Sequence, residues 1–367
     1  MQATDIIELQ KIVYSKNLSR KNLLNYSSCT KEKAYRVQVF RNHSFELVEH
    51  TIAPFLDYAG IGVEFIYSGY DDSLSFTDID MNTDAIIIWI DGTRYKDIDL
   101  SAFIKNRLDF LRKKYNKAVL LVPFSFSLCS YDTSVLVYDL VQLSEEMGHK
   151  FTDLKSEHLT GTKLSRQALI EISRQIGLKY LPAMLRTPIK AVVVDLDNTL
   201  YRGVLGEDGI NGIFLTEGHK QLQFLLKKLS ADGVFLCALS KNEQSDVVDM
   251  FDKRTDFPLK NTDFTKIIAT WDSKYQGMQE ILQFLNIGSD SVVFVDDNIG
   301  EIMSIKAQIP QINVLLASQD ASSTADMLTL YPGMLRISHS NEDNIRKTDV
   351  QANELRSKMK AALSEEE

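Results

Sequence analysis

The sequence predicts an α/β protein built from two doubly wound parallel-sheet domains. Strand-sized apolar segments alternate with amphipathic helical segments along most of the 367 residues, which is typical of parallel sheets with crossover helices. Two of the apolar segments end abruptly in paired carboxylates, as we expect at the carboxyl edge of such a sheet. The chain is long enough for two domains, and its 44% hydrophobic residues suffice for two ordinary cores.

The first half predicts a helical segment followed by one sheet domain. Residues 1–34 are polar and helical in pattern, and an α/β domain is expected over residues 35–185. The stretch from Pro182 to Pro188 is expected to mark the break before the next domain. The strands are predicted at Tyr35–Phe40, Val63–Tyr67, Ala85–Ile90 and Ala118–Pro123, with helices at Phe45–Tyr58, Ser101–Tyr115 and Leu164–Gly177.

The second half predicts another sheet domain over residues 186–340. Only roughly forty residues separate its first acidic loop from Ser240, so we expect a short cap and an open site rather than a full lid domain. Residues 341–367 are expected to form an amphipathic helix and an acidic tail. Strands are predicted at Ala191–Val194, Gly233–Leu239 and Ser291–Val295, with helices at Gly218–Ser230 and Lys274–Leu285.

Polar groups follow all three strands of this second domain. Asp195 and Asp197 come after the first strand, and Asp296 and Asp297 come after the last. Carboxylates gathered at one sheet edge would suit Mg²⁺, which prefers oxygen ligands and binds substrate phosphates. Ser240 and Lys274 add a hydroxyl and an ammonium, which complete a phosphate cradle. The alternative is a pair of strand ends whose Asp and Asn residues only cap backbone groups.

Taken in order, these segments resemble the four motifs of the haloacid dehalogenase (HAD) superfamily of phosphoryl-transfer enzymes. Residues 195–209, 240–242 and 294–301 are similar to its FkbH-like branch. The resemblance implies a Rossmann-like HAD domain, with Asp195 as the nucleophile and Asp197 as the general acid and base. It implies Mg²⁺ ligands at Asp195, Asp197 (through its backbone carbonyl), Asp296 and Asp297, phosphate contacts from Ser240, Lys241, Lys274 and Thr199, and substrate contacts from Arg202, Asn242 and Asn298.

Three functions remain open at this stage. The first is Mg²⁺-dependent phosphatase-like chemistry on a phosphorylated small acid or carrier-linked substrate. The FkbH-like resemblance implies the second, which is glyceryl transfer from 1,3-bisphosphoglycerate to an acyl carrier protein. The third is a non-catalytic scaffold that binds a carrier protein or another partner.

The sequence departs from the FkbH-like pattern at two places. Leu239 stands where we expect a cysteine beside Ser240-Lys-Asn, and Cys237 is predicted to lie in the strand core with an inert thiol. Tyr201-Arg202 stands where we expect Trp-Gly. Both changes indicate an altered substrate choice.

The first domain resembles the SGNH-like portion that precedes the HAD domain in FkbH-like proteins, but it lacks the hydrolase motifs. Arg41-Asn-His-Ser44 stands in place of Gly-Asp-Ser, so esterase activity is not expected. Ser44 is instead predicted to be the N-cap of the helix that begins at Phe45. His43 and Asp91, both expected near strand ends, are predicted to help to select a substrate.

Composition limits the partners. A net charge of −9 argues against nucleic-acid binding, which needs a positive surface. We see no apolar run long enough to span a membrane and no export signal. Three widely spaced cysteines fit a reducing compartment, so a cytoplasmic location is expected.

Overall fold

The computed structural model describes residues 1–28, 35–70, 72–126 and 135–337, which form two compact α/β units. The N-terminal unit contains residues Leu9–Arg186 and the segment that starts at Leu330, and the C-terminal unit contains Met1–Glu8 and Thr187–Thr329. Each unit holds one five-stranded parallel sheet, which confirms the predicted fold class. The helix and tail predicted at 341–367, and residues 29–34 of the first segment, lie outside the described residues.

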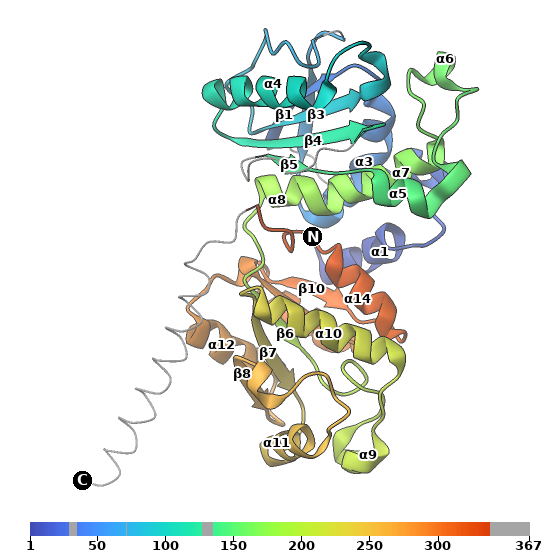
Figure 1. The fold of residues 1–367 in the computed structure, drawn as a ribbon. Helices are drawn as coiled ribbons and strands as arrows, with labels where there is room; N and C mark the ends of the chain where they lie inside the picture. Colours follow the sequence, from blue (N-terminus) through green and yellow to red (C-terminus); the bar gives the residue numbers. More distant parts are fainter. Residues whose placement is uncertain (29–34, 71, 127–134, 338–367) are drawn as a thin grey trace. The chain divides into compact units, whose positions relative to one another are not determined.

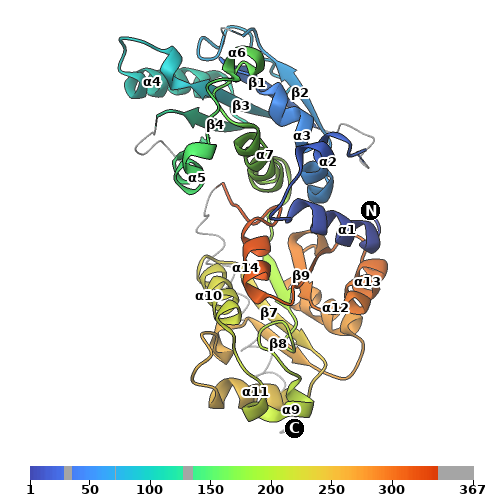
Figure 2. The same ribbon diagram turned by 90° about the vertical axis from the view of Figure 1, so that its right-hand side faces the viewer.

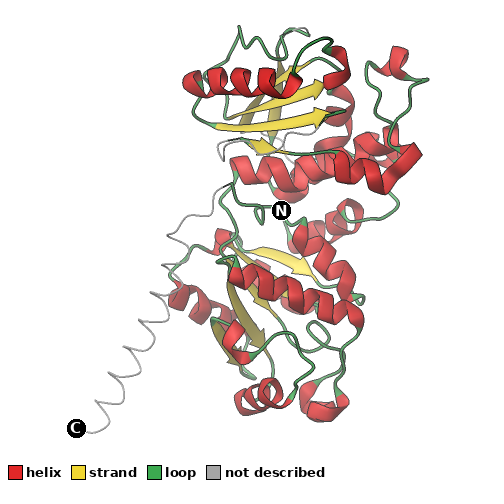
Figure 3. Cartoon of the chain, viewed as in Figure 1, coloured by secondary structure: helices red, strands yellow, loops and turns green. Residues whose placement is uncertain are grey.

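The sheet of the N-terminal unit has the strand order β2-β1-β3-β4-β5. Figure 1 labels β1, β3, β4 and β5, and Figure 3 draws the strands as yellow arrows. Neighbouring strands are all parallel, and Val39 of β1 pairs with Tyr67 of β2 on one side and Ile87 of β3 on the other. The strands are β1 (Tyr35–Arg41), β2 (Val63–Tyr67), β3 (Ala85–Asp91), β4 (Ala118–Phe124) and the two-residue β5 (Leu136–Val137).

Helices cover both faces of this sheet, as the doubly wound pattern predicts. Ile86, Ile88 and Ile90 pack against the apolar side of α4, while α3 and α7 lie on the opposite face (Figure 2). The helices are α1 (Ala3–Val13), which begins in the other unit, α2 (Arg20–Leu24), α3 (Glu46–Ala59), α4 (Leu100–Lys114), α5 (Val141–Met147), α6 (Glu157–Thr160), α7 (Arg166–Gln175) and α8 (Leu181–Leu185), with short 3₁₀ turns at Gly92–Arg94 and Gly148–Lys150.

One local prediction for this unit is wrong. Ser44 does not cap α3: the N-cap position is Phe45, and the Ser44 hydroxyl lies 3.4 Å from that of Tyr70. Phe45 is fully buried against Trp89, and this packing fixes the first turn without a side-chain cap. Helix α8 ends at Leu185, within the stretch from Pro182 to Pro188 where a break is predicted. Its first turn, which follows a π-helical segment at Ile176–Tyr180, tolerates Pro182 although proline lacks an N–H.

The sheet of the C-terminal unit has the strand order β10-β9-β6-β7-β8, again all parallel. The chain starts at the central β6, adds β7 and β8 on one side, and then returns to add β9 and β10 on the other. This reversal beside β6 is where open α/β sheets form a ligand-binding crevice at their carboxyl edge. The strands are β6 (Ala191–Val194), β7 (Phe235–Ser240), β8 (Lys266–Ala269), β9 (Val292–Asp296) and β10 (Asn313–Leu316).

The core of this unit contains alternate residues of the sheet, among them Val193, Cys237 and Phe294, packed against α12 and α13. Only α9 and α10 lie between β6 and β7, so the cap is short, as predicted. The helices are α9 (Leu205–Gly212), α10 (Glu217–Ala231), α11 (Gln244–Lys253), α12 (Lys274–Leu285), α13 (Ile299–Gln308) and α14 (Ala321–Thr329), with 3₁₀ turns at Asn261–Asp263 and Ser289–Ser291. Within the described ranges no helix combines the length and apolarity that a membrane crossing requires.

Candidate active site

Three carboxylates meet at the carboxyl ends of β6 and β9. Asp195, Asp296 and Asp297 each offer an oxygen atom, and these atoms lie within 4.8 Å of one another. The Lys274 ammonium, at the first residue of α12, lies 2.7 Å from Asp195 Oδ1 and 2.6 Å from Asp296 Oδ2. Lys274, Asp195 and Asp296 are all buried. Sheet topology therefore brings together acids that lie about a hundred residues apart in the sequence.

Burial and mutual repulsion shape the electrostatics of this cluster. Burial raises the pKa of the Asp195 carboxyl to about 7, because Lys274 offsets only part of this effect and the Asp296 charge adds to it. The pKa of Asp296 is also raised, chiefly by burial. Burial alone would lower the pKa of Lys274, but the charges of Asp195 and Asp296 raise it above its ordinary value. Three carboxylates face one ammonium, so the donor set fits a divalent cation.

The loop after β6 has an unusual backbone conformation that its residue types allow. Asp195 N–H continues the sheet by donating to the Val295 carbonyl at 2.9 Å. Asn198 adopts a left-handed backbone (φ 53°), which asparagine tolerates, and its side-chain oxygen accepts from Gly203 N–H at 3.1 Å. Gly203 has φ 110°, and a Cβ there would lie 2.8 Å from Asp208 Oδ2. The loop therefore requires a glycine at this position.

Asp197, half-buried in the same loop, has a carboxylate fixed by three donors. Its Oδ1 accepts from the Tyr201 hydroxyl at 2.7 Å and from Leu205 N–H, at the start of α9, at 3.0 Å. Its Oδ2 accepts from Asn242 Nδ2 at 2.9 Å. Burial raises the pKa of Tyr201 far above its ordinary value, so this phenol keeps its proton and remains a donor.

Ser240 and Thr199 supply two buried hydroxyls next to the carboxylates. Ser240 ends β7 and its Oγ accepts from Asn242 Nδ2 at 3.0 Å. Thr199 is 2% exposed, and within the described part of the chain its hydroxyl has no hydrogen-bond partner. A buried hydroxyl without a partner is costly, and a bound phosphate oxygen would satisfy it.

The other predicted contact residues have different partners in this structure. The Lys241 ammonium pairs with Glu301 Oε1 at 2.5 Å, and the Arg202 guanidinium lies over the Phe214 ring, 5.7 Å from its centroid. Asn298 caps α13 by accepting from Gly300 N–H at 2.8 Å. Asn242, predicted to contact substrate, donates to Asp197 and Ser240 and is 1% exposed.

Cys237 lies in the core of β7, as predicted. It is fully buried, and burial raises the pKa of its thiol to about 12, so the thiol stays protonated. Cys29 and Cys129, by contrast, lie outside the described residues.

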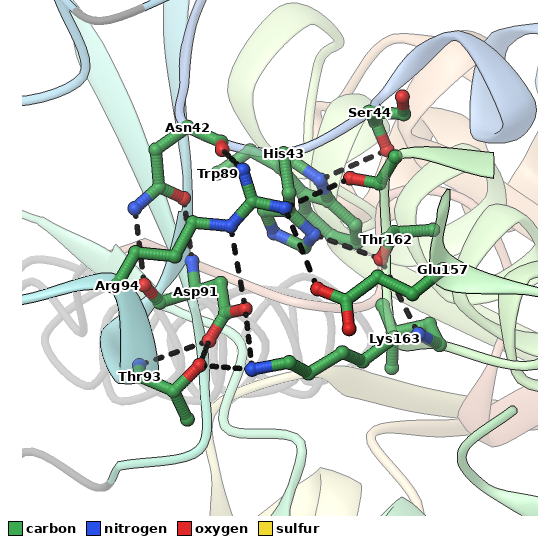
Figure 4. A network of polar contacts seen from close by, with 12 residues as sticks. Asn42, His43, Ser44, Trp89, Asp91, Thr93, Arg94, Glu157, Thr162 and Lys163 are labelled. Carbon is green, nitrogen blue, oxygen red and sulfur yellow. Dashed lines mark hydrogen bonds and ion pairs between the residues drawn. The ribbon is translucent and has the colours of Figure 1, made fainter. Parts of the chain in front are cut away.

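The prediction that His43 and Asp91 help to select a substrate is not supported by their positions. Both side chains are fully buried inside a polar network at the carboxyl ends of β1 and β3 (Figure 4). The His43 ring stacks on Trp89 with centroids 4.7 Å apart, and its Nδ1 lies 2.9 Å from Thr162 Oγ1. Burial lowers the pKa of His43, so its ring is neutral.

The same network attaches residues 157–163 to the sheet of the N-terminal unit. Arg94 donates to the Asn42 carbonyl at 2.5 Å and to the Gly161 carbonyl at 3.2 Å, and its Nε lies 3.6 Å from Asp91 Oδ2 (Figure 4). Lys163 Nζ lies 3.5 Å from the same oxygen. The Arg94 and Lys163 cations of this network are thus paired with buried or half-buried acceptors, which is the arrangement of a structural clamp.

Sequence reasoning missed Tyr201 and the backbone N–H of Leu205 as partners of Asp197. In the sequence, Tyr201 stands out only because it occupies a position where a Trp is expected. Its spacing of four residues from Asp197, within the single helical turn of the loop, is the signal that would have identified it. A backbone donor such as Leu205 leaves no mark in the sequence.

Searches against protein-family models and against curated proteins find no match for this chain. Among solved structures, it is similar to the N-terminal part of the protein BF1531 from Bacteroides fragilis, which contains a phosphatase domain and is complexed with Mg. The identity is 21% and the TM-score 0.66, over 91% of this chain and 99% of that one. The HAD family enzyme bt-2542 from Bacteroides thetaiotaomicron is 15% identical over 36% of this chain and 95% of that one, and its TM-score of 0.27 supports no conclusion. The first similarity shows that the chain shares the α/β fold of the BF1531 fragment.

Proposed function

We propose that the C-terminal unit is a Mg²⁺-dependent phosphatase of the HAD type that uses Asp195 as its nucleophile. The observation that carries this proposal is the buried cluster of Asp195, Asp296 and Lys274, with Asp297 beside it, at the switch point of a parallel sheet. Its excess negative charge calls for a cation, and the neighbouring Thr199 hydroxyl calls for a ligand oxygen. The fold shared with a phosphatase-containing fragment complexed with Mg supports the same reading.

The residues present can perform both halves of a phosphate-ester hydrolysis. An oxygen of Asp195 attacks phosphorus in line while the bond to the leaving oxygen breaks, and Asp197 gives its proton to that oxygen. Asp197 then takes a proton from water, whose oxygen attacks phosphorus and releases phosphate from Asp195. In this proposal Lys274, Ser240 and Thr199 hold the phosphoryl oxygens. Mg²⁺, held by Asp195, Asp296 and Asp297 when bound, would neutralise the charge on these oxygens.

The test measures phosphate release from p-nitrophenyl phosphate and from a panel of phosphorylated small acids, with Mg²⁺ or with EDTA. We expect Mg²⁺-dependent release that falls by at least about 10³-fold in Asp195→Asn. Asp249→Asn is the matched control, because Asp249 forms an exposed pair with Lys253 on α11. An acid-stable, hydroxylamine-labile phosphoryl group on the peptide that contains Asp195 would identify the nucleophile. If neither phosphate release nor a phosphoenzyme appears with any substrate, the proposal is wrong.

Glyceryl transfer from 1,3-bisphosphoglycerate to an acyl carrier protein ranks second. Among the described residues the sole cysteine is Cys237, whose thiol is buried and protonated, so this part of the chain offers no thiol to hold an acyl group. Mass spectrometry of a carrier protein incubated with the enzyme and 1,3-bisphosphoglycerate distinguishes the two functions. A carrier that gains a glyceryl mass would favour transfer. The scaffold hypothesis is favoured only if Asp195→Asn leaves partner binding and biological function intact.

A further inference from the structure

The carboxylate of Asp197 is held asymmetrically, and the asymmetry distinguishes its two oxygens. Oδ1 accepts two hydrogen bonds, from the Tyr201 hydroxyl and from Leu205 N–H, whereas Oδ2 accepts one, from Asn242. A carboxylate oxygen has two lone pairs that can accept hydrogen bonds in the carboxylate plane. Oδ1 is therefore saturated, and Oδ2 keeps one open position.

We propose that Tyr201 and Asn242 are positioning residues that fix Asp197 so that Oδ2 is the atom that exchanges protons with substrate and water. The proposal rests on the phosphatase function above and adds to it the atom that acts and the residues that aim it. In the first half-reaction the Oδ2–H bond breaks as the leaving oxygen takes the proton. In the second, Oδ2 takes a proton from the attacking water as the Asp195–phosphorus bond breaks.

Asn242 also links this acid and base to the phosphate-binding hydroxyl. Its side-chain nitrogen has two hydrogens, and one is directed to Asp197 Oδ2 while the other is directed to Ser240 Oγ, at 2.9 Å and 3.0 Å. Because Ser240 Oγ accepts this hydrogen bond, its own hydrogen is free to donate to a phosphoryl oxygen. A single amide thereby orients the proton-transfer group and a phosphate donor together.

The position of Tyr201 excludes a direct contact with substrate. Its side chain is fully buried, and its ring packs near Phe257, with centroids 5.8 Å apart. Its hydroxyl reaches the site only through Asp197 Oδ1. Any catalytic effect of this hydroxyl must therefore pass through Asp197.

The experiment compares Tyr201→Phe with the wild type on a series of substituted phenyl phosphates, with rapid quenching to measure phosphorylation of Asp195. A leaving group that is a weak base departs without a proton, whereas a basic one needs the general acid. We expect the variant to phosphorylate about 10- to 100-fold more slowly with the most basic leaving group and within about twofold of wild type with the most acidic one. General acid catalysis contributes about 10²- to 10⁴-fold, and the variant keeps this acid but loses one of the donors that orient it. Hydrolysis of the phosphoenzyme should slow with every substrate.

Two further variants make the result specific. Tyr67→Phe is the matched control, because it removes a tyrosine hydroxyl that donates to a carboxylate, Glu49 at 2.5 Å, in the other unit. Asn242→Asp keeps the shape of the side chain but removes the hydrogen bonds that it donates to Asp197 and Ser240. This variant should therefore show the same leaving-group dependence. Its KM should also rise, because Ser240 is no longer oriented toward the phosphate. Asn242→Ala tests the same point if two facing carboxylates prevent folding.

The outcomes separate this inference from the function on which it rests. The positioning role is overturned if the phosphorylation rate of a variant falls equally for all leaving groups. It is also overturned if neither Tyr201→Phe nor the Asn242 variants slow phosphorylation. In both cases the phosphatase proposal stands. A wild-type protein that forms no phosphoenzyme with any substrate overturns the phosphatase proposal itself. Unchanged unfolding temperatures of the variants exclude a merely structural effect.

Discussion

Replacing Lys274 with methionine removes the only cation within contact of Asp195 and Asp296 in the described part of the site. The ammonium lies 2.7 Å and 2.6 Å from the two carboxylates. At an effective dielectric constant of about 20, Coulomb's law gives about 6 kcal/mol for each contact. Desolvation of the buried charges offsets most of this, and removing one partner of a buried pair typically costs about 3–5 kcal/mol. We therefore expect Lys274→Met to lose about 3 kcal/mol of stability at pH 8 without divalent cations.

The loss should depend on pH in a defined direction. The pKa of Asp195 is about 7 in the folded protein, against 3.8 for an ordinary aspartate, so between these values the native state binds more protons than the unfolded state. Stability from this group is thus greatest at low pH and is lost as the pH rises toward about 7. At about pH 5.5 the proton on Asp195 removes a charge that Lys274 would have neutralised. At this pH the loss of stability caused by Lys274→Met should be about half of that at pH 8. At pH 8, added Mg²⁺ should also reduce the loss.

Hydrogen–deuterium exchange of peptides from β6 and β9 is the suitable assay, because a chain with two units need not unfold in one step. Lys266→Met is the matched control: its ammonium pairs with the exposed Glu280 at 2.7 Å on the same unit, and its loss should cost less than about 1 kcal/mol. A loss at Lys274 no larger than that at Lys266, or one that is equal at pH 5.5 and pH 8, would refute this account of the cluster.

Three other predictions concern the metal, the N-terminal unit and the thiol. Mg²⁺ should bind up to about tenfold more tightly at pH 7 than at pH 6, because the cation displaces a proton from Asp195, whose pKa is about 7. Calorimetry in two buffers would measure both the affinity and the released proton. Equal affinities at the two pH values would count against this prediction. Arg94→Met should destabilise β1 and β3 by about 2 kcal/mol, as measured by hydrogen exchange, because the Asn42 carbonyl loses its hydrogen bond and Asp91 Oδ2 loses an ion-pair partner. A change within about 0.5 kcal/mol would show that the network is not a clamp. Cys237 should react with iodoacetamide at least about 100-fold more slowly in the folded than in the unfolded protein, as peptide mapping would show, because its thiol is buried and its pKa is about 12; rapid labelling would place it near the surface.

Periodicity identified most of the regular elements, because a strand or helix with a buried face must repeat its apolar residues with a fixed spacing. The four longer strands of the N-terminal unit and helix α12 lie within about one residue of the predicted bounds. The edge strands β5, β8 and β10 were not assigned, because each has only two to four residues and, unlike the equally short β6, none is followed by paired acids that mark its end.

The sequence by itself determined where the chemistry lies: acids that follow buried strands must meet at the carboxyl edge of a parallel sheet, and Asp195, Asp296 and Lys274 do meet there. Only the tertiary structure decided which donors surround each acid. Asn242 reaches Asp197 across 45 residues of sequence, and Lys241 reaches Glu301 across 60. The physical reason is that a hydrophobic pattern specifies the buried face of an element, whereas the direction of a polar side chain in a loop is set by the partners that packing brings within hydrogen-bonding distance.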